Sequence, residues 1–136
     1  MSAQPLGVQR ITSGAPWETK VGYRRAVRVG DQIFVAGTVS VSADGSVHAP
    51  GDAGAQAARC LEIIADALKQ AGAELRHVVR TRVYVTNMDL QTQAAVGSAH
   101  LAVFKDCPPA SAMIGVSALA DPAYLVEIEA DALIYD

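Results

Sequence analysis

The chain has 136 residues, of which 51% are hydrophobic and 5% aromatic, so we expect one domain over residues 1–136 with an aliphatic core. Its net charge of -3 argues against a nucleic-acid partner, because binding to phosphates requires clustered Lys and Arg. No apolar run reaches the ~20 residues of a membrane span. Met1 to Pro5 lack the basic and apolar segments of a signal peptide, so we expect a cytoplasmic protein without a membrane partner.

The N-terminal part of the chain predicts three strands. Val8–Ile11 is a short candidate strand, and residues 12–18, which contain Gly and Pro, are expected to form a loop. Residues 22–29 and 32–39 alternate in polarity as strands do. Because Gly30-Asp31 separates them, we expect a β-hairpin.

Two helices are predicted, each preceded by an aspartate. Asp52 is a candidate N-cap for a helix that runs to about Ala71, with Gly72 as its stop. Apolar residues recur along this helix at helical spacing, so one face is expected to pack on a sheet. Asp89 is a candidate N-cap for a second helix over about residues 91–104, which two following prolines end.

Three more strands are expected, at residues 78–85, 108–116 and 125–135. The last two flank a turn at Asp121-Pro122 and predict either a β-hairpin or two sequential strands. Alternation along the final strand puts three carboxylates on one face, those of Glu127, Glu129 and Asp131. Since like charges repel, that face should meet solvent, cations, hydrogen-bond donors or a subunit boundary.

This order of elements predicts an α+β fold in which both helices cover one face of a sheet. Aliphatic side chains also occupy positions on the other face, which favours burial there by an oligomer. No Gly-rich phosphate loop and no spacing typical of metal ligands occurs, so no cofactor and no metal are expected.

Several segments, in conserved order, resemble the RidA/YjgF family of small trimeric proteins, also described as the endoribonuclease L-PSP type. They are Gly22-Tyr23-Arg24-Arg25-Ala26-Val27, Phe34-Val35-Ala36-Gly37-Thr38, Gln56-Ala57-Ala58-Arg59-Cys60-Leu61-Glu62, Thr81-Arg82-Val83-Tyr84-Val85-Thr86, Pro109-Ala110 and Val126-Glu127-Ile128-Glu129-Ala130-Asp131-Ala132. The resemblance implies a chorismate-mutase-like mixed sheet, a homotrimer with clefts between subunits, and hydrolytic deamination of small reactive imines or enamines.

The resemblance also implies site residues. Glu127 aligns with the family glutamate that orients or activates the attacking water; the alternative is an ordinary strand carboxylate. Tyr23 aligns with a tyrosine that lines the cleft, and the alternative is an edge-strand aromatic. Gly37 falls on the glycine of the family's strand motif and is counted with the substrate-binding residues.

Two neighbours of Tyr23 are further candidates for substrate binding. Arg25 lies two residues after Tyr23 and would share its strand face. Its guanidinium could bind a carboxylate, or it could form an ion pair with Glu127 or Glu129 of a neighbouring subunit. Trp17 could cover a ligand by stacking, or it could anchor its loop to the core.

Ser111 occupies the position of the arginine that, in the family, holds a substrate carboxylate. A hydroxyl cannot neutralise an anion, so an active enzyme should have altered specificity. A nucleophilic Ser111 would need a histidine or lysine base, and the sequence around it supplies none. The sequence therefore leaves two readings open: a divergent deaminase, and a non-catalytic small-molecule-binding or interaction trimer. Nuclease activity is the least favoured reading.

Overall fold

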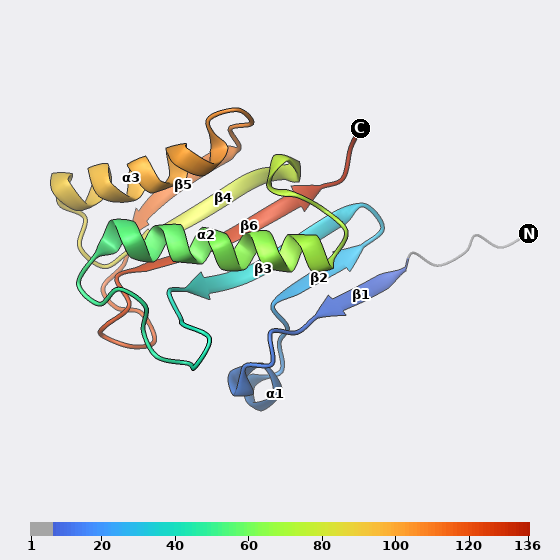
Figure 1. The fold of residues 1–136 in the computed structure, drawn as a ribbon, viewed down its shortest axis with the longest axis horizontal. Helices are drawn as coiled ribbons and strands as arrows, with labels where there is room; N and C mark the ends of the chain where they lie inside the picture. The colour runs from blue at the N-terminus through green and yellow to red at the C-terminus, as the bar shows by residue number, and fades with distance from the viewer. Residues whose placement is uncertain (1–6) are drawn as a thin grey trace, which may run out of the picture.

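Six strands form one mixed sheet in the computed structural model, which describes residues 7–136 (Figure 1). Their order across the sheet is β1-β2-β3-β6-β4-β5. The bounds are β1 Val8–Ile11, β2 Ala26–Val29, β3 Gln32–Val39, β4 Val78–Val85, β5 Ala110–Gly115 and β6 Val126–Leu133. The predicted α+β class is confirmed. The expectation for Met1 to Pro5 lies outside the described residues.

The strand pairing confirms the predicted hairpin of β2 and β3 and decides between the two alternatives for the C-terminal strands in favour of sequential strands. Val29 pairs with Gln32, so the Gly30-Asp31 turn joins β2 and β3 as predicted. β5 and β6 are sequential strands that do not pair, because β6 lies between β3 and β4. β6 buries every second residue, as a central strand does, whereas β5 is largely exposed at the edge. β5 runs parallel to β4, and such a pair requires a crossover connection.

Two long helices cover one face of the sheet, as the sequence predicts (Figure 1). They are α2, Ala53–Gln70, and α3, Leu90–Phe104, which makes the crossover between β4 and β5. The Asp52 side chain accepts a hydrogen bond from the Ala55 N–H, and Asp89 accepts one from the Thr92 N–H. Both predicted N-caps are therefore confirmed. A short 3-10 helix, Leu75–His77, precedes β4.

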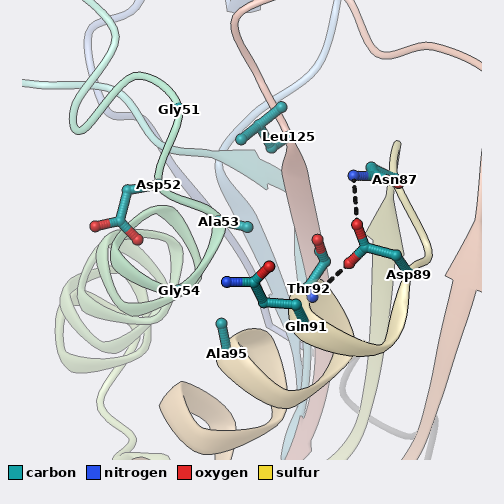
Figure 2. Close-up of a pocket in the computed structure, with 10 residues that line it drawn as sticks. All are labelled: Gly51, Asp52, Ala53, Gly54, Asn87, Asp89, Gln91, Thr92, Ala95 and Leu125. Carbon is teal, nitrogen blue, oxygen red and sulfur yellow. Dashed lines mark hydrogen bonds between the residues drawn. The ribbon is translucent and has the colours of Figure 1, made fainter.

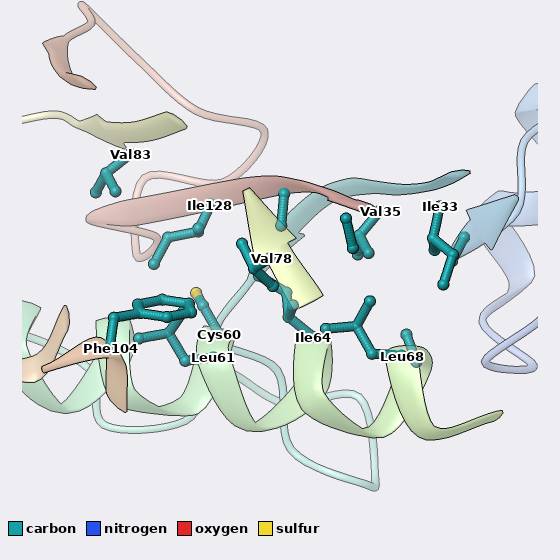
Figure 3. Packing of buried hydrophobic residues seen from close by; sticks show 14 of the residues in the cluster. Ile33, Val35, Cys60, Leu61, Ile64, Leu68, Val78, Val83, Phe104 and Ile128 are labelled. Atoms are coloured by element: carbon teal, nitrogen blue, oxygen red, sulfur yellow. The ribbon is translucent and has the colours of Figure 1, made fainter. Parts of the chain in front are cut away.

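The core lies between α2 and the sheet. Figure 3 shows Leu61, Ile64 and Leu68 of α2 pointing toward Ile33 and other strand residues. Cys60 is also fully buried on this stripe, and burial raises the pKa of its thiol to about 12. Cys60 is therefore a packing residue, which the helical spacing of the sequence predicts.

The other face of the sheet, which we call the open face, has no helix of residues 7–136 over it. It carries the three carboxylates of β6, as alternation predicts. Tyr84 donates a hydrogen bond of 2.7 Å to Glu129, and Arg82 forms ion pairs with Glu129 and Asp131. Exposed Phe34 and Leu133 lie on the same face.

The segment before β2 differs from the prediction. A helical turn, α1, spans Pro16–Val21 where a loop was expected, and β2 begins at Ala26 instead of residue 22. Pro16 suits the first position of a helix because its φ is fixed and it needs no N–H partner there. Gly22 ends the helix in the left-handed region, with φ 91°. Tyr23 therefore lies outside the strand.

Candidate functional site

An irregularity in β3 creates space beside Glu127. Val35 pairs with Ala130 and Thr38 with Ile128, so Ala36 and Gly37 together form a β-bulge opposite β6. A Cβ atom on Gly37 would lie 3.1 Å from both Cδ and Oε1 of Glu127. The absence of a side chain at Gly37 is therefore what leaves room for this carboxyl group.

Glu127 is half-buried on the open face of β6. Burial raises the pKa of its carboxyl group, nearby Arg25 lowers it, and Glu129 raises it further; the net shift is upward. A carboxyl group with a raised pKa takes up a proton more readily than an ordinary glutamate. A raised carboxyl pKa is one feature of glutamates that act in general acid-base chemistry.

Arg25 brings a half-buried positive charge to the same place. Its Nη2 donates a hydrogen bond to the Gly37 carbonyl oxygen. Its Nε is buried without a hydrogen-bond partner among the described residues. Burial lowers the pKa of the guanidinium, and the charges of Tyr23, Glu18 and Glu127 oppose that shift. No ion pair of residues 7–136 joins Arg25 to Glu127, so the cation influences the carboxylate without neutralising it by contact.

Glu18 anchors the segment that carries Trp17 and Tyr23. Only 1% of Glu18 is exposed. Its carboxylate accepts hydrogen bonds from the Thr12 hydroxyl at 2.8 Å and from the Ser13 N–H and hydroxyl. Burial acts to raise the pKa of Glu18, but these hydrogen bonds lower it overall. Sequence reasoning did not find Glu18; the signal was Thr12-Ser13 placed just before a proline-initiated turn.

The two aromatic candidates lie at the surface. Trp17 is 62% exposed, with Lys20 Nζ 5.2 Å from its ring centroid, so it does not anchor α1 in the core of this chain. Tyr23 is 37% exposed, and its N–H donates to the Glu18 carbonyl oxygen at 2.9 Å. Because Tyr23 precedes β2, strand alternation does not place it on one face with Arg25, and that step of the prediction is wrong.

Ser111 lies on the opposite side of the sheet from Glu127. It is exposed on β5, and its hydroxyl accepts a hydrogen bond of 2.8 Å from the buried Thr81 of β4. The Thr81 hydroxyl is also 2.9 Å from Nε2 of His100 on α3. Sequence reasoning did not place His100 here, because its contact with Thr81 depends on how α3 lies over the sheet. We call these three residues the Ser111 chain.

The structure therefore separates three of the predicted site residues, Glu127, Gly37 and Arg25, from Ser111. These three together with Glu18, which was not predicted, form what we call the Glu127 cluster. Glu127 and Ser111 point to opposite faces of the sheet, with β4 between their strands. Within one chain, Ser111 and Glu127 cannot contact the same small ligand.

A pocket of about 440 Å³ lies elsewhere, between the N-termini of α2 and α3 (Figure 2). Its two acidic groups are the helix caps, Asp52 and Asp89. Asp89 also accepts a hydrogen bond of 3.0 Å from the Asn87 side chain. These groups already have structural partners, and none of the predicted site residues lines the pocket.

Two kinds of feature are not seen in residues 7–136. No three His, Cys, Asp or Glu side chains of this part of the chain lie close enough together to hold a metal ion. Among the same residues, no helix combines the length and hydrophobicity needed to cross a bilayer.

Comparison with known families identifies the family of this chain. Residues 13–134 match the family model described as Endoribonuclease L-PSP. An uncharacterized protein of Streptomyces coelicolor is 33% identical over 125 residues, covering 92% of this chain and 91% of that protein. A RutC family protein of Pyrococcus abyssi is 34% identical over 108 residues, covering 79% and 83%. The chain therefore belongs to the RidA/YjgF family, also called the endoribonuclease L-PSP family.

Solved structures agree with the fold. A member of the YjgF/YER057c/UK114 family from Mycobacterium tuberculosis is 42% identical, with a TM-score of 0.84 over 94% of this chain and 100% of that chain. RidA from an Antarctic Psychrobacter is 26% identical, with a TM-score of 0.76 over 97% and 100%. The mixed sheet with helices on one face is thus the fold of this family.

Proposed function

We propose that this protein is a RidA-like enzyme that hydrolyses the C=N bond of small reactive imines or enamines and releases ammonia. The observation that carries the proposal is the Glu127 carboxyl group, which is half-buried against the space left by Gly37 and has a raised pKa. A carboxylate in this position can accept a proton from a water molecule as that water attacks carbon. Arg25 and Tyr23 would orient the substrate.

A complete site in this proposal needs more than one copy of the chain. Ser111 and Glu127 lie on opposite faces of the sheet, so a ligand could reach both only where two copies meet. Exposed apolar side chains on the open face support such contact: Phe34 is 48% exposed, Leu133 42% and Ile114 37%. We therefore propose the homotrimer with intersubunit clefts that the sequence resemblance implies. Mass measurement in solution tests it, and a monomer would contradict it.

The enzymatic proposal is tested by hydrolysis of imines generated in situ. The substrates are 2-iminopropionate, 2-iminobutyrate and a panel of neutral imines. We expect turnover of neutral imines by the wild type and loss of that turnover in Glu127→Ala. Glu62→Ala is the matched control, because Glu62 is exposed on α2 and distant from the Glu127 cluster. A Glu127→Ala variant with full turnover would contradict the proposed base.

Ser111→Arg adds a test of specificity. A charge-assisted contact is worth roughly 1.5–3 kcal/mol, so restoring a guanidinium should improve use of the anionic imino acids by at least about tenfold. The gain is expected only if the proposed cleft forms.

The alternative function is a non-catalytic small-molecule-binding or interaction trimer. One observation favours it: Ser111 carries no charge and its hydroxyl already accepts a hydrogen bond from Thr81, so this position offers a substrate carboxylate no cation. If the wild type and Ser111→Arg are both inert on all of these imines, this alternative replaces the enzymatic proposal. In either case we propose that the protein is cytoplasmic and has no nucleic-acid partner. Incubation with RNA tests the second point, and we expect neither binding nor cleavage of the RNA.

A further inference from the structure

The Ser111 chain connects three elements through a single hydroxyl group. Thr81 of β4 is fully buried, at 0% exposure. Its Oγ1 lies 2.8 Å from the Ser111 hydroxyl on β5 and 2.9 Å from His100 Nε2 on α3. Thr81 and Ser111 are paired in register across the parallel strands, so the backbone fixes their approach. Of these three residues, only Ser111, which lies on the edge strand β5, is exposed.

The single hydroxyl hydrogen of Thr81 couples the donor and acceptor roles of the three side chains. The Thr81 hydroxyl has one hydrogen and can donate only once. If Thr81 donates to Ser111, His100 Nε2 must donate to Thr81 and the Ser111 hydrogen points outward. If Thr81 donates to His100, Ser111 donates to Thr81 and presents a lone pair outward. A ligand group bound to Ser111 therefore determines the direction of both hydrogen bonds in the Ser111 chain.

The absence of charge in the Ser111 chain restricts which ligand groups can bind to it. Burial lowers the pKa of His100, so its imidazole is neutral near pH 7. Thr81 and Ser111 are neutral as well. A carboxylate placed against Ser111 would lose hydration without meeting a positive charge, whereas an amide or hydroxyl would exchange one neutral hydrogen bond for another.

We propose that Ser111, Thr81 and His100 form one specificity element that binds an uncharged polar group of the substrate, such as an amide or hydroxyl, and disfavours a carboxylate. Ser111 makes the contact, and Thr81 and His100 are positioning residues. This inference rests on the proposed function for the presence of a substrate at Ser111. It adds the chemical class of the group that the substrate presents there.

Two probes of equal size test it: pyruvamide, which is neutral, and pyruvate, which is anionic. Binding is followed by NMR on protein labelled with ¹⁵N-histidine, in which His48 and His77 serve as internal references. We expect the wild type to bind pyruvamide at least about tenfold more tightly than pyruvate, since the anion lacks a charged partner. Pyruvamide should shift the Nε2 signal of His100.

Variants separate a direct role from a structural one. Ser111→Ala should lose the preference, whereas Ser117→Ala, at another exposed serine, should keep it. Thr81→Val keeps the shape of the buried residue but interrupts the chain, so the His100 signal should no longer respond to pyruvamide. Thr81→Ser should restore the response.

Three results would overturn the inference: equal affinity for the two probes, an equal His100 response in Thr81→Val, and no binding of either probe. Since neither probe is hydrolysed, the measurement is independent of turnover. An intact preference with no imine hydrolysis would reject only the enzymatic proposal. Imine hydrolysis together with equal probe affinity would reject only this inference.

Discussion

The Glu127 cluster and the Ser111 chain hold polar groups in different ways. In the cluster, ionisable groups are partly withdrawn from water and held by backbone atoms: Arg25 by the Gly37 carbonyl, and Glu18 by the Ser13 N–H. In the Ser111 chain, three neutral side chains are joined by hydrogen bonds to one another. We therefore propose different roles for the two regions: the Glu127 cluster moves protons, and the Ser111 chain recognises a neutral group. Each of the following changes affects one region and should leave the other intact.

The largest expected effect is that of Gly37→Ala on turnover. The new Cβ would stand 3.1 Å from the Glu127 carboxyl group and displace it. A displacement of about 1 Å at a catalytic group can cost about a hundredfold in rate, which is the loss we expect in kcat/KM for neutral imines. Gly37 has no positive φ, so backbone strain does not explain the loss.

Gly97→Ala is the matched control for that change. Gly97 lies within α3, and a Cβ there would have no neighbour within 4 Å. This variant should keep full activity and gain about 0.5–1 kcal/mol of stability. Equal activity of the two alanine variants would contradict the role given to the space at Gly37.

Glu18→Gln should lower the free energy of unfolding by about 1–3 kcal/mol, because buried hydrogen bonds to the carboxylate are lost or weakened. The folded-state pKa of Glu18 is below its usual value of 4.5, so its stabilising contribution is present above that pH and is lost as the pH falls through the folded-state pKa. Urea unfolding at several pH values measures both effects.

For Glu18 the control is Glu62→Gln, since Glu62 is exposed in an ion pair with Arg59 on α2. Glu62→Gln should change the free energy of unfolding by no more than about 0.5 kcal/mol. A Glu18→Gln variant as stable as this control at neutral pH would show that the Glu18 carboxylate does not anchor α1.

Thr81→Val should cost about 0.5–1.5 kcal/mol of stability, the net value of ordinary hydrogen bonds. Ser111 is exposed and can bond to water instead, which keeps the cost small. Thermal unfolding measures this loss. The pH profile of turnover should not change, because Glu127 lies on the other face of the sheet; a changed profile would contradict the separation of the two regions.

The smallest expected effect is a shift in pH dependence. Turnover that uses ionised Glu127 should rise with pH, with a midpoint above the usual glutamate value of 4.5, because burial raises the pKa. Arg25→Met should move this midpoint higher still, since Arg25 lowers the pKa of Glu127. The pH dependence of kcat/KM in both proteins tests this, and a downward movement would contradict it.

Sequence reasoning succeeded where the signal was local. Asp52 and Gly72 mark the two ends of α2, and alternation alone places Glu127 on the open face. It failed where the outcome depended on distant segments. Whether β6 pairs with β5 or enters between β3 and β4 is decided by which strand can bury a complete apolar face. The contact of His100 with Thr81 follows from the packing of α3, which no short motif encodes.

The position of β6 also affects how the protein can fold. β6, Val126–Leu133, follows the other five strands of the described residues in sequence, yet it joins β1, β2 and β3 to the pair of β4 and β5. Until residues 126–133 leave the ribosome, these two groups of strands are not connected, and the inner edges of β3 and β4 lack hydrogen-bond partners. Long-range closure of this kind is slow, so a stalled or truncated nascent chain would be prone to aggregation.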